Sequence, residues 1–174
     1  MRGLFQSLRG RKRVRELLPR EAIASIGQPF VDVLCSMYDG DLQVGFDGNT
    51  YEIDAVTPLG PPQGMLIYQL VRELKPENSL EIGLAFGFST MYFLAAIHAN
   101  GSGHHVAVDP FQYEWWHGIG VAREKVVGIE RGLFEFVQET LSWRLRDLLE
   151  SSGNSVSFSL TVTIHSTESS LISR

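Results

Sequence analysis

The stretch Ser79-Leu-Glu-Ile-Gly-Leu-Ala-Phe-Gly-Phe-Ser89 decides the fold of this 174-residue chain. It begins as a short β run and then carries glycines at positions 83 and 87. Because glycine has no Cβ, the backbone there can turn sharply from a strand into a helix and approach a ligand closely. The N-terminal end of the following helix would attract a carboxylate or a phosphate. The stretch therefore predicts a strand, a ligand-binding turn and a helix.

Helices and strands alternate on both sides of this stretch. The predicted elements are a helix over 64–74, a strand over 79–83, a helix over 91–100 capped by Ser89 or Thr90, a strand over 105–108, a helix near 121–127, a strand over 134–137 and a helix over 140–149. This order is typical of an α/β fold, a Rossmann-like open and mostly parallel sheet with helices on both faces. Right-handed crossovers would place successive strands side by side, and ligands bind at the edge where the strands end.

Asp109 ends the second predicted strand, 22 residues after Gly87. A carboxylate at that position can accept hydrogen bonds from both hydroxyl groups of a ribose. A dinucleotide fingerprint would need glycine at 85 and glycine or alanine at 88, but these residues are Ala85 and Phe88, which disfavours a nicotinamide oxidoreductase. The glycine-bearing turn and the acid together predict a nucleoside site.

Charge is distributed unevenly along the chain. Residues 1–20 carry seven basic residues and one acidic residue, whereas the remainder carries 8 basic and 19 acidic ones. The acidic remainder of the chain argues against nucleic-acid binding, because phosphate contacts need Lys and Arg.

The sequence has no uninterrupted apolar run long enough for a membrane span or a secretory signal, so we expect a cytoplasmic protein. We divide it into a basic tail (1–20), an irregular N-terminal cap (21–60), a ligand-binding Rossmann-like half (61–153) and an aberrant C-terminal tail (154–174). In the cap, Asp39-Gly40 and Asp47-Gly48 mark turns between short apolar runs, as in a small hairpin or an irregular structure.

Residues 62–149 resemble a class I S-adenosylmethionine-dependent methyltransferase, and within that superfamily they are similar to small-molecule O-methyltransferases of the catechol type. The resemblance is carried by Gly64 and by the stretches 80–90, Val106-Ala-Val-Asp-Pro110 and 134–137. It implies S-adenosylmethionine as cofactor and methyl transfer to a small molecule, most simply O-methylation.

The resemblance also implies roles for individual residues. Those that would line the methionine moiety are Glu81, Gly83, Ala85 and Gly87. Ser89 would hold the methionine carboxylate, Asp109 would bind the ribose, and Ser142 and Trp143 sit where the family contacts the adenine. We assign no catalytic residue and no metal ligand, because the Asp-Gly-x-His signature of the acceptor and metal site is absent. His117, beside two tryptophans, is the other candidate base, although a histidine in an aromatic loop is more often packed or hydrogen-bonded.

The last 21 residues include ten Ser or Thr and predict no further helix. We expect the chain to stop where the family needs its fourth strand, which would leave a central strand as an exposed edge. A shifted reading frame from Ser159 onward permits the string I-D-G-N-H-T-F-D-R-V-L-V-D-F, which contains the missing signature. The expected protein is thus a C-terminally incomplete methyltransferase with impaired activity. The alternative is a non-catalytic nucleoside-binding or dimerisation module, and a homodimer is compatible with either.

Overall fold

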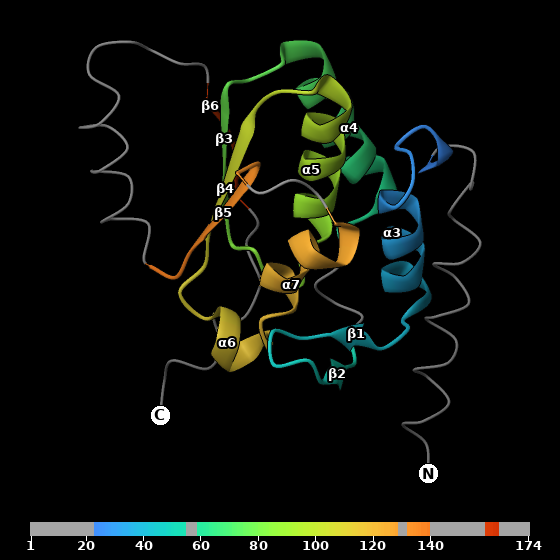
Figure 1. The fold of residues 1–174 in the computed structure, drawn as a ribbon, viewed down its shortest axis with the longest axis vertical. Coiled ribbons are helices and arrows are strands. Elements are labelled where there is room, and N and C mark those ends of the chain that lie inside the picture. The colour runs from blue at the N-terminus through green and yellow to red at the C-terminus, as the bar shows by residue number, and fades with distance from the viewer. Residues whose placement is uncertain (1–22, 55–58, 129–131, 140–158, 164–174) are drawn as a thin grey trace.

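The computed structural model describes residues 23–54, 59–128, 132–139 and, as backbone, 159–163 (Figure 1). The helices are α3 (Phe30–Asp39), α4 (Pro61–Leu74), α5 (Phe88–Asn100), α6 (Gln112–Trp115) and α7 (Ile119–Val127). The strands are β1 (Gln43–Val44), β2 (Thr50–Tyr51), β3 (Asn78–Ile82), β4 (His104–Val108), β5 (Phe134–Val137) and β6 (Ser159–Thr163). Among these residues no helix is long and apolar enough to cross a membrane.

The central sheet has the strand order β5-β4-β3-β6, and every neighbouring pair is parallel. Leu80 on β3 is in register with Val106 on β4 and with Thr161 on β6. The C-terminal ends of the strands therefore lie at one edge, followed there by the residues after Ile82 and Val108. The predicted α/β fold and the side-by-side order of its first three strands are confirmed.

The structure corrects our expectation for the C-terminal tail. Residues Ser159–Thr163 form β6, which pairs along the whole of β3, so β3 is an interior strand and not an exposed edge. Within the described part of the sheet, the edge strands are β5 and β6. The alternation of Thr161, Val162 and Thr163 suits a strand, because β-branched residues fit a pleated surface. We did not predict this strand, because we interpreted the high Ser and Thr content of the segment as that of an irregular tail.

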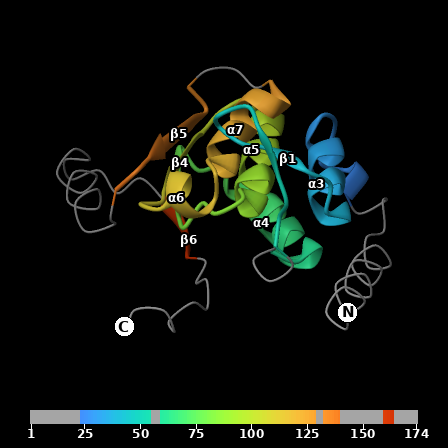
Figure 2. The ribbon, with the colours of Figure 1, turned by 90° about the horizontal axis from the view of Figure 1, so that it is seen from below.

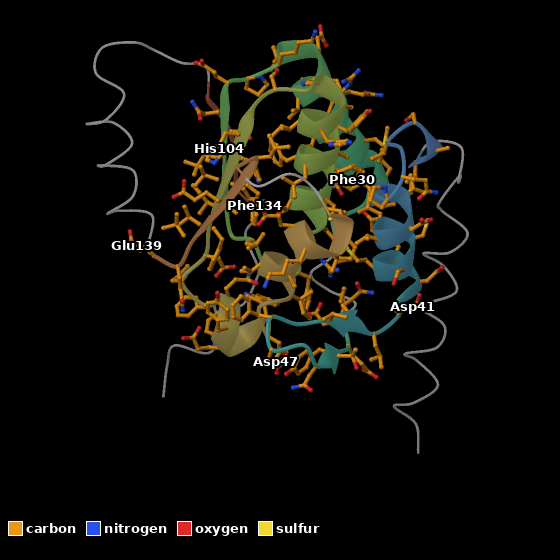
Figure 3. All side chains as sticks on the ribbon, viewed as in Figure 1. Phe30, Asp41, Asp47, His104, Phe134 and Glu139 are labelled. Atoms are coloured by element: carbon orange, nitrogen blue, oxygen red, sulfur yellow. The ribbon has the colours of Figure 1, made fainter. Side chains whose placement is uncertain are left out.

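Helices α4, α5 and α7 cover one face of the sheet, and α3 packs on the outer side of α5 (Figures 1 and 2). Helix α5 is buried on all sides from Phe88 to Ile97, because it lies between the sheet and the other helices. Phe30 of α3 and Phe134 of β5 belong to one hydrophobic cluster, with α5 between them (Figure 3). The helix expected over 140–149, which would cover the other face, lies outside the described residues.

The N-terminal boundaries of helices α4 and α5 differ from the prediction for local physical reasons. Helix α4 starts at Pro61, where proline is favoured because its missing N–H needs no partner. Helix α5 starts at Phe88 with Gly87 as its N-cap, and no side chain caps it. The hydroxyl groups of Ser89 and Thr90 donate instead to Glu81, so they are not available for capping.

The N-terminal cap contains a helix, α3, where we expected a hairpin or irregular structure. In α3 the apolar side chains recur at helical spacing, and Phe30, Val33, Leu34, Met37 and Tyr38 are buried. Gly40, which we interpreted as part of a turn between short apolar runs, is the left-handed C-cap of this helix, with φ +73°. The turn predicted at residues 47–48 does connect a small antiparallel hairpin, β1–β2.

Candidate functional site

The loop between β3 and α5, residues 83–87, is a tight turn. Gly83, Ala85 and Gly87 all have positive φ, at +86°, +46° and +81°. The N–H of Gly83 donates to Val108 O at 2.9 Å, and the N–H of Gly87 donates to Leu84 O at 2.8 Å. Positive φ costs glycine little and costs alanine more, so a strong interaction has to hold Ala85 in place.

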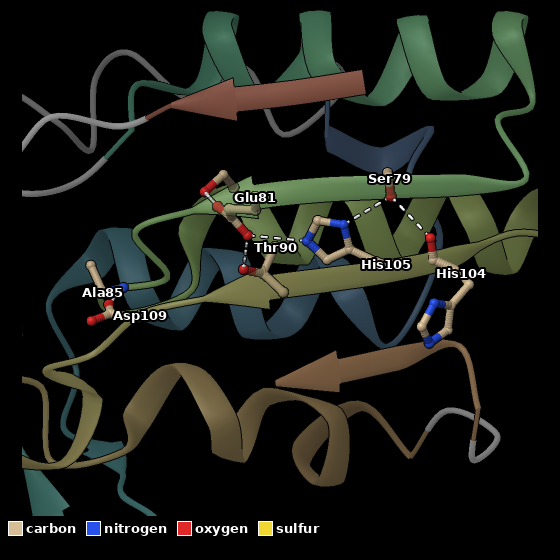
Figure 4. A network of polar contacts seen from close by, with 8 residues as sticks. Ser79, Glu81, Ala85, Thr90, His104, His105 and Asp109 are labelled. Carbon is tan, nitrogen blue, oxygen red and sulfur yellow. Dashed lines mark hydrogen bonds and ion pairs between the residues drawn. The ribbon is translucent and has the colours of Figure 1, made fainter. Parts of the chain in front are cut away.

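Asp109 provides that interaction. Its carboxylate oxygen Oδ2 accepts the N–H of Ala85 at 2.9 Å, so the loop and the acid meet at the sheet edge (Figure 4). Oδ2 also accepts Gln112 Nε2 at 3.2 Å, and Oδ1 accepts the N–H of Phe111 at 2.9 Å. Gln112 Nε2 also donates to Ala85 O, at 2.9 Å, and so links the acid to the loop a second time. The glycine-bearing loop and Asp109 thus form one site.

These hydrogen bonds limit what else Asp109 can bind. A carboxylate offers about four acceptor positions. Two of them on Oδ2 are occupied by Ala85 and Gln112, and one on Oδ1 is occupied by Phe111. No donor among the described residues uses the remaining position on Oδ1.

Glu81 lies at the centre of a buried polar network beside the loop (Figure 4). Its side chain is 0% exposed and accepts the hydroxyls of Ser89 and Thr90 on α5. Nε2 of His105 on β4 lies 3.1 Å from the same carboxylate. Ser89 is only 1% exposed, so its hydroxyl is committed to Glu81 and not directed toward solvent. The network joins β3, β4 and the first turn of α5.

His105 continues the network to the other end of β3. Its Nδ1 is 2.9 Å from Ser79 Oγ, and Ser79 Oγ is 3.3 Å from His104 O. The single hydroxyl hydrogen of Ser79 can serve only one acceptor. Whether Ser79 Oγ donates to His105 Nδ1 or accepts from it depends on the tautomer of His105. The ring of His105 stacks on Phe93, with centroids 4.3 Å apart, and is fully buried, so the network stabilises the site and does not face a substrate.

The first turn of helix α7 packs against the glycine-bearing loop. A Cβ on Gly120 would lie 2.6 Å from Ala85 O, so only glycine fits this contact. Three residues further along α7, the buried Arg123 donates from Nε to Phe86 O at 3.1 Å. Neither Gln112 nor Arg123 was predicted from the sequence. Arg123 lies in a helix with charged neighbours, where an arginine is ordinarily solvated, so no sequence signal identifies it.

The aromatic loop after Asp109 contains the short helix α6. His117 has φ +52°, and its ring stacks on Tyr51 with centroids 3.9 Å apart, which is the packed alternative for this residue. Phe111 and Trp115 are about half exposed and stack on each other.

Ser142 and Trp143, the predicted adenine contacts, lie outside the described residues. In the part of the chain that the structure describes, no group of three or more His, Cys, Asp or Glu side chains could hold a metal ion.

Comparison with solved structures gives low sequence identity. An O-methyltransferase from Streptomyces achromogenes, TomG, involved in tomaymycin synthesis and solved in complex with SAM, is 18% identical with a TM-score of 0.46. A Klebsiella pneumoniae protein assigned as an O-methyltransferase is 19% identical with a TM-score of 0.50, which supports the fold alone. The alignments cover 79% and 89% of this chain but only 53% and 58% of those chains.

Comparison with curated proteins finds no match. The profile of a protein family described as a methyltransferase domain matches residues 80–168, which are 89 of the 174 residues. The matched region begins in β3 and includes the glycine-bearing loop, Asp109 and β6. The chain therefore belongs to this methyltransferase domain family.

Proposed function

We propose that the chain binds S-adenosylmethionine at the edge formed by loop 83–87 and Asp109, as part of a methyltransferase for a small-molecule acceptor. The observation that carries the proposal is the hydrogen bond from the N–H of Ala85 to the Asp109 carboxylate at 2.9 Å. It brings together two features that are 24 residues apart in the sequence, at the sheet edge where α/β folds bind nucleosides. Membership of the methyltransferase domain family supports the same ligand.

The residues present fit a nucleoside. Gly83 and Ala85 are partly exposed, so their main chain can line the ligand, and the free acceptor position on Asp109 Oδ1 suits a ribose hydroxyl. Glu81 accepts hydrogen bonds from the hydroxyls of Ser89 and Thr90 and thereby fixes α5 against β3. When bound, S-adenosylmethionine supplies a methyl group on a sulfonium that is attacked in line by the acceptor. The contribution of this chain is alignment of the two reactants.

The finer part of the proposal concerns the reading frame. We propose that the segment from Ser159 is read in a shifted frame, and that turnover is impaired because the Asp-Gly-Asn-His string of the alternative frame is lost. A carboxylate and an imidazole are the groups that would help to deprotonate a hydroxylated acceptor. Codons for residues 159–173 that cannot encode this string in the shifted frame would refute the idea.

The test compares the 174-residue chain with a version in which the frame is restored. Isothermal titration with S-adenosylhomocysteine measures cofactor binding, and a methyl-release assay with a panel of hydroxylated small molecules measures turnover. The proposal expects both chains to bind, and only the restored chain to release methyl groups over many turnovers. Absence of binding by both chains would refute the cofactor assignment. Binding without release by either chain would instead favour a non-catalytic nucleoside-binding module.

A further inference from the structure

Arg123 on α7 is a buried cation that has no acidic partner in the described part of the chain. Its side chain is 1% exposed, and no carboxylate of the described residues makes an ion pair with it. Nε donates to Phe86 O at 3.1 Å, Nη1 donates to Gln43 Oε1 at 2.8 Å, and Nη2 has no partner among the described residues. Burial lowers the pKa of Arg123 to about 10. An arginine held at such a cost is not explained by packing alone, because an apolar side chain of similar size avoids the desolvation penalty.

The partners of Arg123 belong to two separate parts of the molecule. Gln43 lies on β1 in the N-terminal cap, and its amide Nε2 donates to Ser36 Oγ at 2.9 Å and to Asp41 O at 3.0 Å. Phe86 lies in the glycine-bearing loop. A continuous series of hydrogen bonds therefore runs from α3 through Gln43 and Arg123 to the loop.

The bond to Phe86 acts where the loop turns into α5. The carbonyl of Phe86 shares its peptide plane with the N–H of Gly87, which donates to Leu84 O and closes the turn. Arg123 Cγ also lies 3.0 Å from where a Cβ on Gly87 would be. Arg123 thus restrains both the orientation and the position of this peptide, while Asp109 holds Ala85 in the same loop.

We propose that Arg123 is a positioning residue that connects the N-terminal cap to loop 83–87 and thereby sets the affinity of that loop for its cofactor. The affinity measurement rests on the proposed function, namely that loop 83–87 binds S-adenosylmethionine. Among the described residues, the hydrogen bonds of Gln43 lead to the loop through Arg123, so the two residues act in series and their effects are not independent. Substituting either one releases the same peptide.

The experiment uses the full chain and the variants Arg123→Met, Gln43→Met, the double variant and Arg123→Lys. Arg72→Met is the matched control, because Arg72 of α4 bonds Asn100 at the C-terminal end of α5, whereas the loop precedes the N-terminal end of α5. Affinity for S-adenosylhomocysteine is measured by titration calorimetry well below each melting temperature. Hydrogen exchange of the peptide covering residues 84–88 is measured without ligand, and reports on the loop whether or not the ligand binds.

We expect Arg123→Met to weaken binding about tenfold, the effect of one hydrogen bond to a charged group, and to speed exchange in 84–88 but not in β3. The double variant should match Arg123→Met, and Arg123→Lys should recover part of the affinity by donating to Phe86 O. Affinity and exchange within about twofold of the parent, or single effects that multiply in the double variant, would overturn the proposal. If the parent chain binds nothing, the proposed function fails, and the exchange data still decide the role of Arg123. If Arg123→Met does not fold, Gln43→Met and Arg123→Lys carry the same test.

Discussion

Replacing Asp109 with asparagine perturbs the structural connection on which the site depends. The carboxylate accepts two main-chain N–H groups, one from Ala85 on Oδ2 and one from Phe111 on Oδ1. An asparagine side chain has one oxygen, so its NH₂ group must face one of these donors. One buried N–H then loses its partner, and the charge that strengthens the other bond is removed.

The magnitude follows from these two losses. A hydrogen bond to a charged group contributes about 1.5–3 kcal/mol, and an unpaired buried donor costs about 1–3 kcal/mol. Allowing for relaxation, we expect Asp109→Asn to reduce the free energy of unfolding by about 3 kcal/mol. For a domain of this size that corresponds to a melting temperature roughly 6–12 °C lower. Loss of the proposed ribose contact should weaken S-adenosylhomocysteine binding roughly 10- to 100-fold.

Urea unfolding followed by circular dichroism measures the stability, and titration calorimetry measures the affinity. Asp41→Asn is the control, since the side chain of Asp41 is exposed and the substitution removes the same charge. The control should change neither quantity appreciably. If Asp109→Asn were as stable as the parent chain and bound the ligand equally well, the hydrogen bonds assigned to the carboxylate would not hold the loop.

Three further substitutions test the elements around the site. Glu81→Gln should lower the free energy of unfolding by about 2 kcal/mol in urea denaturation, because the amide cannot accept from all of the surrounding donors; the exposed Glu77→Gln should not. Gly64→Ala should lower the melting temperature despite the higher helix propensity of alanine, because the new Cβ would lie 2.1 Å from the ring of Tyr92; an unchanged value would mean that α4 and α5 pack less closely than described. Gly120→Ala should weaken S-adenosylhomocysteine binding in calorimetry, because the new Cβ would push against the loop carbonyl 2.6 Å away; undiminished affinity would show that α7 and loop 83–87 are not coupled.

The part of the fold that could be predicted is the part governed by local chemistry. Strand β3, its glycines and the acid after β4 are adjacent in sequence or separated by one helix, and right-handed crossovers then fix their relative positions. The C-cap at Gly40 and the apolar spacing of α3 were equally local signals, but the adjacent Asp39 favoured the interpretation as a turn.

The rest depends on contacts between residues far apart in sequence. The hydroxyls of Ser89 and Thr90 are common N-caps, and only the buried Glu81 across the helix–strand interface explains why they do not cap α5. Arg123 bonds Gln43, 80 positions earlier, and the sequence around Arg123 is that of an ordinary solvated helix. The main-chain donors to Asp109 are likewise known only from the folded loop.

A nuclear magnetic resonance titration of the isotope-labelled 19.4 kDa chain with S-adenosylhomocysteine tests directly whether loop 83–87 and Asp109 bind the cofactor. We predict saturable shifts of the amide signals of Gly83, Ala85 and Phe111, because these N–H groups line the loop or bond the acid. The amide of Gly48, in the exposed hairpin turn, should stay unchanged. Signals of the loop and of Phe111 that do not move at saturating ligand, or shifts confined to other parts of the chain, would contradict the assignment.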